Sequence, residues 1–197
     1  AAWMEGAQAR REALVVRIQP TGYQVFPEYD LGLQFRTMDL LKDTDVPVPQ
    51  VFWLETSSDL LGAPFYVMKR VEGRVPEDSP PYHAAGWLTE IEPEERRAIW
   101  LGGFDCMAQI HRLDPDRTGF GFLDRPVLAS DPLDQQIVYY ERYLEWAARG
   151  EPQPTTEAAF EWLKKNKPGD EPIGLVWGDA RIGNIIFDGT RPAAVLD

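Results

Sequence analysis

Cysteine is almost absent from this sequence of 197 residues, which contains only Cys106. A single cysteine excludes an intrachain disulfide framework and a metal site built from several thiolates. Cys106 lies in a helical pattern with Ile99, Gly103 and Ile110. We therefore expect a small buried thiol at this position rather than a nucleophile.

Long apolar runs are also absent. No stretch approaches the ~18 residues of a membrane span, and the N-terminal residues lack the apolar segment of a signal peptide. We therefore expect a cytoplasmic protein that has no membrane partner.

Basic residues are few. The sequence has 20 Lys and Arg but 32 Asp and Glu, so its formal net charge is -12. This balance argues against non-specific nucleic-acid binding, which needs clustered Lys and Arg, and it would repel anionic membranes. It would mildly favour a cationic substrate, although an acidic surface usually serves only solubility.

Aromatic residues are abundant, since seven Trp, seven Tyr and nine Phe supply large groups for burial. These residues argue against global disorder. The chain is long enough for one core or for two small lobes that share a cleft.

The pattern of apolar residues changes along the chain. The first part predicts strands and one helix, residues 74–93 form a Pro-rich loop, and the remainder predicts helices followed by short strands. We expect strands at 14–19, 51–55, 65–71, 173–177, 185–187 and 193–196, and helices at 31–42, 93–111, 132–150 and 156–165. This order predicts a two-lobe α+β plan with a mid-chain link near residues 68–73.

The end of the chain carries the residues best suited to chemistry. Asp179, Arg181 and Asn184 lie at intervals i, i+2 and i+5, and Asp197 follows thirteen residues after Asn184. A loop of this form can present one carboxylate to an acceptor hydroxyl while an amide oxygen and a second carboxylate hold Mg²⁺. Arg181 can neutralise charge on a transferring phosphoryl group. A plain β-hairpin with polar surface residues would show the same pattern.

Two resemblances extend this interpretation. Protein-kinase catalytic loops carry Asp, Lys and Asn at the same intervals, followed by a distal metal-binding Asp. More closely, Trp-Gly-Asp-Ala-Arg-Ile-Gly-Asn at 177–184, followed by Ala-Val-Leu-Asp at 194–197, resembles the aminoglycoside phosphotransferase family. Residues 43–49, 61–68 and 71–73 resemble its N-lobe and hinge, and 107–114 resemble its first C-lobe helix, in which His111 is structural.

The resemblance implies a protein-kinase-like fold with part of a strand-rich N-lobe at 1–70, a hinge at 71–73, and part of a mainly helical C-lobe with a catalytic β-hairpin at 74–197. It also implies transfer of the γ-phosphate of ATP or GTP to the hydroxyl of a small molecule, with Mg²⁺ as cofactor. The acceptors of relatives include aminoglycosides, macrolides, choline, amino alcohols and hydroxyacyl thioesters. The Trp-Gly-Asp form resembles phosphotransferase domains associated with acyl-CoA dehydrogenases, which favours an acceptor other than an antibiotic.

Residue roles follow from the same resemblance. Asp179 would be the base or orienter of the acceptor hydroxyl, and Arg181 would lie beside the γ-phosphate. Asn184 and Asp197 would hold Mg²⁺. Arg17 would contact the nucleotide phosphates, and the backbone at Met68, Lys69 and Val71 would meet the adenine.

The sequence also departs from the family pattern. Trp177 replaces the usual His, Arg17 replaces Lys, and Gln34 stands where a Glu would pair with that cation. The phosphate-covering hairpin should precede Leu14, where only Gly6 offers a turn. The chain therefore looks like an internal portion of a longer enzyme, and this portion would turn over poorly by itself.

Two alternatives to an active enzyme remain open. The chain could be a catalytically silent nucleotide-binding or interaction module of kinase-like fold. The residues at positions 34 and 177, which depart from the family pattern, would be consistent with this alternative. It could also be an acidic scaffold whose hairpin is purely structural.

Overall fold

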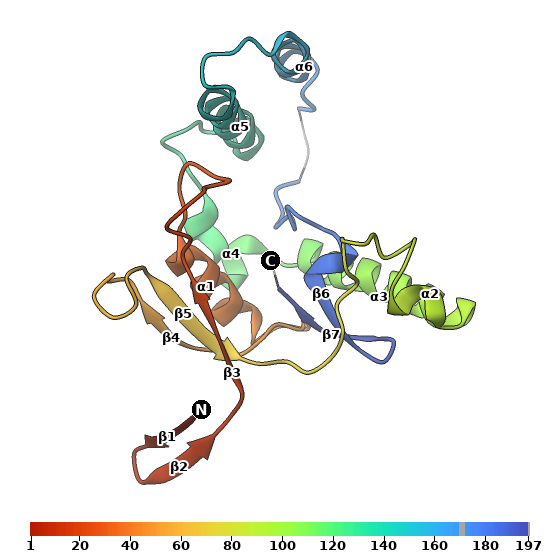
Figure 1. Ribbon diagram of the computed structural model, residues 1–197. Coiled ribbons are helices and arrows are strands. Elements are labelled where there is room, and N and C mark those ends of the chain that lie inside the picture. Colours follow the sequence, from red (N-terminus) through yellow and green to blue (C-terminus); the bar gives the residue numbers. More distant parts are fainter. Residues whose placement is uncertain (170–171, 197) are drawn as a thin grey trace.

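The computed structural model describes residues 1–169 and 172–196 (Figure 1). A three-stranded antiparallel sheet lies in the N-terminal part and has the order β3-β5-β4, with β3 at Leu14–Ile18, β4 at Val51–Glu55 and β5 at Phe65–Lys69. The helix α1, Leu31–Leu41, packs on β4 and β5. The predicted helix at 31–42 and the predicted strands at 51–55 and 65–71 are confirmed, and these two strands pair antiparallel.

A small apolar core joins α1 to this sheet. Asp30 caps the helix, because its Oδ1 accepts a hydrogen bond from the Leu33 N–H at 2.9 Å. The ring of Phe35 meets the buried ring of Tyr66 edge to face at 6.2 Å. The buried members of this core are Leu31, Met38, Val51, Tyr66 and Met68.

The N-terminal residues form a hairpin that the sequence did not predict. The strands β1, Ala2–Glu5, and β2, Gln8–Arg11, pair antiparallel around a turn that contains Gly6 at φ +60°. Trp3 of this hairpin lies 5.2 Å from the ring of Trp53 and 6.1 Å from that of Phe52. The expectation that no hairpin precedes Leu14 is therefore wrong.

The middle of the chain is helical. Its elements are α2 at Trp87–Glu90, α3 at Pro93–His111, α4 at Pro115–Thr118, the 3-10 helix η1 at Phe120–Leu123, α5 at Pro132–Ala148 and α6 at Pro154–Lys165. The predicted helices at 93–111, 132–150 and 156–165 are confirmed. Pro93 in the first turn of α3, and a capping box between Glu92 and Glu95, explain why that helix begins where it does.

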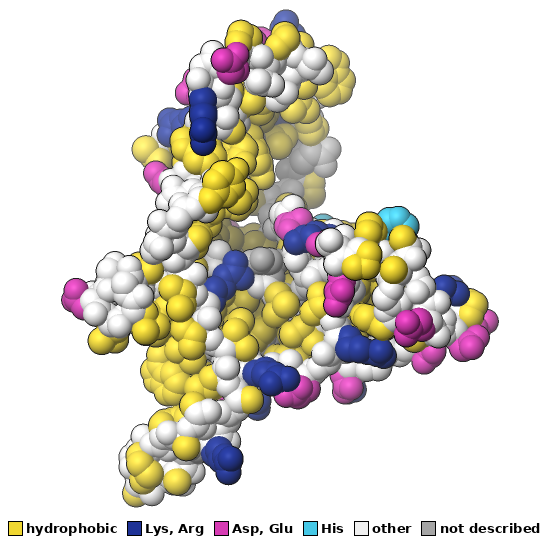
Figure 2. Space-filling view, in the orientation of Figure 1, with side chains coloured by type: hydrophobic (Ala, Val, Ile, Leu, Met, Phe, Trp, Pro, Cys, Tyr) yellow, Lys and Arg dark blue, Asp and Glu magenta, His cyan; other side chains and the backbone are white. Residues whose placement is uncertain are grey.

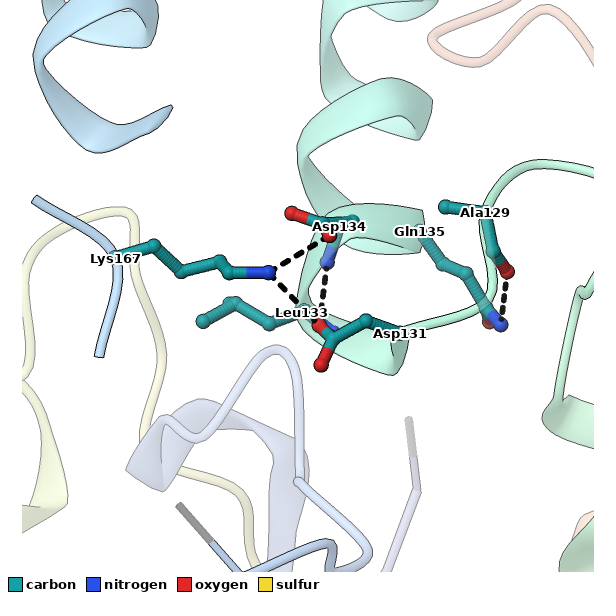
Figure 3. A network of polar contacts seen from close by, with 6 residues as sticks. All are labelled: Ala129, Asp131, Leu133, Asp134, Gln135 and Lys167. Atoms are coloured by element: carbon teal, nitrogen blue, oxygen red, sulfur yellow. Dashed lines mark hydrogen bonds and ion pairs between the residues drawn. The ribbon is translucent and has the colours of Figure 1, made fainter. Parts of the chain in front are cut away.

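Polar contacts fix the start of α5 (Figure 3). Asp131, the N-cap of α5, accepts hydrogen bonds from the N–H groups of Leu133 and Asp134, at 2.9 and 3.0 Å. The Asp134 N–H, followed by the charge of Lys167, holds the pKa of Asp131 below its ordinary value. Lys167, which follows α6, also lies 2.7 Å from Asp134, so these contacts tie the end of α6 to the start of α5.

The C-terminal part forms a second hairpin, in which the 3-10 helix η2, Ile182–Asn184, leads into β6, Ile185–Asp188, and β7, Arg191–Val195. The predicted strands at 185–187 and 193–196 are confirmed. The predicted strand at 173–177 is wrong, because these residues form no strand. Ile173 and Val176 are both 72% exposed, and no described strand lies beside them to complete a ladder.

A larger core joins α3, the second hairpin and the end of α1. Gly102 of α3 lies so close to β7 that an added Cβ would stand 2.9 Å from two ring carbons of Pro192. Cys106 is 2% exposed, which confirms the expected buried thiol, and burial raises its pKa to about 11. The buried members of this core are Leu41, Val46, Leu88, Ile99, Cys106, Ile110, Phe120, Trp177, Ile182, Ile185, Phe187 and Val195.

Acidic and basic side chains are interspersed over the face of the molecule in Figure 2. Among the helices of the described residues, none combines the length and the apolar character that crossing a membrane requires.

Candidate functional site

The motif at 177–184 lies in a loop that is anchored at both ends. At its start, Trp177 is buried. Its backbone N–H donates to Nε2 of His111, at the end of α3, at 3.5 Å. At its other end, Ile182 and Asn184 of η2 are buried in front of β6. Between these anchors the side chain of Asp179 is 64% exposed. Buried neighbours therefore hold an exposed carboxylate in a fixed loop.

Asp179 receives two hydrogen bonds on the same oxygen. Nδ2 of Asn184 donates to Oδ2 of Asp179 at 2.9 Å, and Nε of Arg181 donates to that oxygen at 3.0 Å. Oδ1 accepts no hydrogen bond from any residue that the structure describes. The carboxylate is thus fixed through one oxygen, and the other remains available to a ligand.

Asn184 serves the loop mainly through its amide nitrogen. Nδ2 also donates to the backbone oxygen of Asp179 at 3.0 Å, and the side chain is 5% exposed in total. Within the described chain, the amide oxygen of Asn184 accepts no hydrogen bond. Because Mg²⁺ prefers oxygen ligands, this residue fits the role of a metal ligand that the sequence predicted for it.

Asp197, the second predicted metal ligand, lies outside the described residues. The preceding residue, Leu196, donates its N–H to the backbone oxygen of Asn184 at 2.9 Å. No group of three or more His, Cys, Asp or Glu that could hold a metal ion occurs in residues 1–169 and 172–196. A metal here would therefore depend on one or two protein ligands together with phosphate and water oxygens, which is the usual situation for Mg²⁺.

Arg181 lies between two carboxylates. Its Nε donates to Asp179, and its Nη1 donates to Oδ2 of Asp78 in the loop that precedes α2. The hydrogen bond and charge of Asp179, and then the charge of Asp78, raise the pKa of Arg181 above its ordinary value. The guanidinium therefore stays charged, as neutralisation of a phosphoryl group requires.

Sequence reasoning missed Asp78. It is 103 residues from Arg181 along the chain and belongs to no recognisable motif. The single available signal was an acidic pair, Glu77 and Asp78, within the Pro-rich loop.

The predicted nucleotide residues lie on the sheet and on the segment that follows it. Arg17 of β3 pairs in register with Tyr66 of β5, and Met68 of β5 is buried. The Lys69 N–H donates to the oxygen of Gln50 at 2.7 Å, so this amide belongs to the sheet. The backbone of Val71 forms no hydrogen bond within the described residues, so its N–H and C=O can meet a ligand.

The expected contact between Gln34 and Arg17 is not formed through the amide oxygen. Oε1 of Gln34 is buried and accepts no hydrogen bond from a described residue. The cation pairing that the family pattern would place at position 34 is therefore not formed at this oxygen within the described residues.

Comparisons with known proteins identify the family and the fold. The model of the phosphotransferase enzyme family matches residues 5–197. A crystal structure from Ralstonia eutropha JMP134, described as "a putative aminoglycoside phosphotransferase", superposes with a TM-score of 0.67 and 26% identity, over 100% of this chain and 54% of that one. The predicted kinase-like fold, with a small antiparallel sheet and a helical part, is confirmed by this likeness.

Curated relatives are longer proteins. "Probable acyl-CoA dehydrogenase IBR3" of Arabidopsis thaliana is 30% identical over 190 residues, which are 92% of this chain and 22% of that protein. "Acyl-CoA dehydrogenase family member 10" of Mus musculus is 30% identical over 186 residues, which are 93% of this chain and 16% of that protein. The chain thus spans about a fifth of the length of these relatives. Because the family model matches almost the whole length of the chain, the chain belongs to the phosphotransferase enzyme family.

Proposed function

We propose that this chain transfers the γ-phosphate of ATP or GTP to a hydroxyl group of a small molecule, and that it does so in the cytoplasm. The observation that carries the proposal is the state of Asp179. One carboxylate oxygen is fixed by Asn184 and Arg181, while the other accepts no hydrogen bond from the described residues. A carboxylate held in this way is suited to orient a hydroxyl and to take its proton.

In the proposed reaction, Oδ1 of Asp179 accepts a hydrogen bond from the acceptor hydroxyl. As the acceptor oxygen forms its bond to the γ-phosphorus, the bond from that phosphorus to the β,γ-bridging oxygen breaks, and the hydroxyl proton passes to Asp179. The nucleoside diphosphate leaves with the bridging oxygen. Arg181 lies beside Asp179 and can offset negative charge on the transferring group.

The remaining residues would bind the nucleotide. Asn184 and Asp197 would hold Mg²⁺, which when bound supplies positive charge to the phosphate oxygens. Arg17 on β3 would contact the phosphates. The backbone at Met68, Lys69 and Val71 would bind the adenine, with Val71 best placed because its N–H and C=O are not used within the described residues.

For the acceptor, we propose a hydroxyacyl thioester ahead of an aminoglycoside. The support is that the curated relatives carry the name acyl-CoA dehydrogenase, while one solved structure carries the name aminoglycoside phosphotransferase. We propose no nucleic-acid or membrane partner. Both acceptor classes should be offered in the assay described below.

Replacement of Asp179 tests the proposal in the full-length protein. We expect Asp179→Ala to lower γ-phosphate transfer by about 10² to 10⁴-fold, because the acceptor hydroxyl loses its base, while Mg·ATP still binds. Radiolabelled ATP measures transfer, and calorimetry measures binding. Asp188→Asn is the matched control, because Asp188 lies at the far end of β6 and is exposed. Unchanged transfer in Asp179→Ala would contradict the assignment of the base.

The same assay tests the silent nucleotide-binding module, which the unpartnered Oε1 of Gln34 favours. Binding of Mg·ATP without transfer to any offered acceptor or to water would support that function. Absence of both binding and transfer would support the acidic scaffold.

A further inference from the structure

Asp78 forms a direct link between two segments that are far apart in sequence. Its Oδ2 accepts a hydrogen bond from Nη1 of Arg181, and the two side chains are 55% and 49% exposed. Its Oδ1 lies 3.2 Å from the position that a Cβ at Gly183 would occupy. The absence of a side chain at position 183 therefore lets the Asp78 carboxylate approach the catalytic loop.

The backbone that carries Asp78 is held against the catalytic hairpin. Arg74 and Phe187 exchange two backbone hydrogen bonds, of 2.9 and 2.8 Å. Gly73 permits this approach, because its φ is +147° and an added Cβ would stand 2.5 Å from the oxygen of Phe187. Nε1 of Trp87 donates to the oxygen of Val75 at 3.1 Å, which fixes the next part of the loop. Asp78 is thus presented from a backbone that is braced on β6 and on α2.

One exposed ion pair would not hold Arg181 well. A pair of this kind contributes only about 0 to 1 kcal/mol, since it is screened by water and restricts a long side chain. Two carboxylates on different nitrogens of the same guanidinium fix its plane, because the fork of donors is rigid. Asp78 therefore restricts Arg181, and Arg181 in turn donates to Oδ2 of Asp179.

We propose that Asp78 is a positioning residue for phosphoryl transfer. It holds the guanidinium of Arg181, which keeps Oδ2 of Asp179 engaged and leaves Oδ1 for the acceptor hydroxyl. Asp78 touches no reacting atom in this arrangement and acts entirely through Arg181. This inference rests on the proposed function, because it assigns Asp78 a part in the same reaction.

Kinetics of the full-length protein test the proposal, with Mg·ATP as the nucleotide and water as the acceptor. We expect Asp78→Asn to lower kcat between about tenfold and about a hundredfold, because misplacement of a catalytic group has costs of this order. The KM for Mg·ATP should stay within about twofold, and Asp78→Glu should restore part of the rate. Glu77→Gln is the matched control: this exposed neighbour loses the same charge but forms no ion pair with the described residues.

The deciding comparison uses Arg181→Ala as a second background. If Asp78 acts through Arg181, Asp78→Asn causes no further loss of kcat once Arg181 is absent. An equal loss of kcat in both backgrounds would overturn the proposal. A kcat for the Asp78→Asn single variant equal to that of the wild-type protein would overturn it as well.

A chemical measurement that needs no activity separates this proposal from the proposed function. Phenylglyoxal modifies accessible arginines, and peptide mass spectrometry gives the rate at Arg181. We expect this rate to rise several-fold in Asp78→Asn and to stay unchanged in Glu77→Gln. An unchanged rate in Asp78→Asn would overturn the positioning role. A faster rate, combined with no turnover even in the wild-type protein, would overturn the proposed function and leave Asp78 as the residue that holds Arg181.

Discussion

Single atoms decide what the loop at 177–184 can do. Asn184 uses Nδ2 to hold both the backbone and the carboxylate of Asp179, so its amide oxygen is the atom that remains for a ligand. An amide supplies donor and acceptor from one side chain, which neither a carboxylate nor an aliphatic group can do. There are therefore two separate reasons for Asn at this position, which are the hydrogen bonds that hold the loop and the proposed contact with Mg²⁺.

Asn184→Asp separates these two reasons. The variant retains an oxygen for Mg²⁺ but loses both donors and places a second carboxylate beside Asp179. We expect the free energy of unfolding at pH 7 to fall by about 1–3 kcal/mol, because the buried residue 184 no longer donates to the backbone oxygen and carboxylate of Asp179 and like charges meet. Urea unfolding measures the change. Asn166→Asp, at the exposed end of α6, is the control for loss of a single amide donor, which here binds the oxygen of Trp162 at 2.8 Å, and should lower this free energy less than Asn184→Asp does. Equal stability of Asn184→Asp and wild type would contradict the geometry of the loop.

The sequence predicted Asp179, Arg181 and Asn184 together because eight consecutive residues contain all of them. Their hydrogen bonds are local and follow from the turn at Gly178 and from η2. Asp78 could not be predicted in this way, since its contact with Arg181 exists only after the loop before α2 has packed against β6. The local motif thus predicted the candidate residues of the loop, whereas the contact of Asp78 with Arg181 arises only from tertiary packing.

At the scale of elements, the β6–β7 hairpin is placed by its contact with α3. Gly102 and Gly103 are adjacent in this helix but meet different surroundings. A Cβ at Gly102 would stand 2.9 Å from Pro192 of β7, whereas one at Gly103 would stand 3.6 Å from Ile185, which is an ordinary contact. The closeness of α3 and β7 therefore depends on one of the two glycines.

Substitution of each glycine by Ala tests this contact. Ala is the better helix former by about 1 kcal/mol, so Gly103→Ala should be neutral or raise the free energy of unfolding. Gly102→Ala should lower it by about 1–3 kcal/mol, because β7 must move away from the added methyl group. Thermal and urea unfolding of both variants measure the difference. A stabilised Gly102→Ala would show that α3 and β7 pack less closely than the structure places them.

Elements with strong local signals were predicted well. The helices α3 and α5 have Pro in the first turn and acidic caps, and the strands β4 and β5 are separated by clear turn residues. The hairpin β1–β2 was missed because its strands have only four residues each, β2 is mostly polar, and part of its support comes from the distant Trp53. The segment 173–177 was predicted to be a strand because of its apolar residues, but a strand also needs a partner, and the described fold places none beside it.

At the scale of the whole molecule, the two cores are joined in several places beyond the predicted hinge at 71–73. The end of α1 enters the larger core through Leu41, and the guanidinium of Arg36 lies 4.1 Å from the ring of Phe122. The Val195 N–H donates to the oxygen of Pro47 at 2.8 Å. Helix α1 and the residues after it therefore connect the sheet to the helical part. A movement of one part relative to the other would have to change these contacts.

A further connection runs from the segment before α1 to α5. The hydroxyl of Tyr143 donates to the oxygen of Val25 at 3.0 Å, and the ring of Phe26 lies 6.0 Å from that of Tyr143. The Val25 N–H in turn donates to the hydroxyl of Tyr29 at 3.0 Å. These contacts are exposed and few, so we expect this connection to open at low free energy compared with either core.

Removal of one hydroxyl should loosen this connection selectively. Tyr143→Phe deletes the hydrogen bond to Val25 while retaining the ring, so amide hydrogen exchange in residues 23–29 should become several-fold faster. Exchange in β5 and α3 should not change, because their amides are protected by the two cores. Tyr140→Phe is the matched control, since the Tyr140 hydroxyl has no hydrogen-bond partner within the described residues. Equal exchange at 23–29 in wild type and Tyr143→Phe would mean that the aromatic rings alone hold the segment on α5.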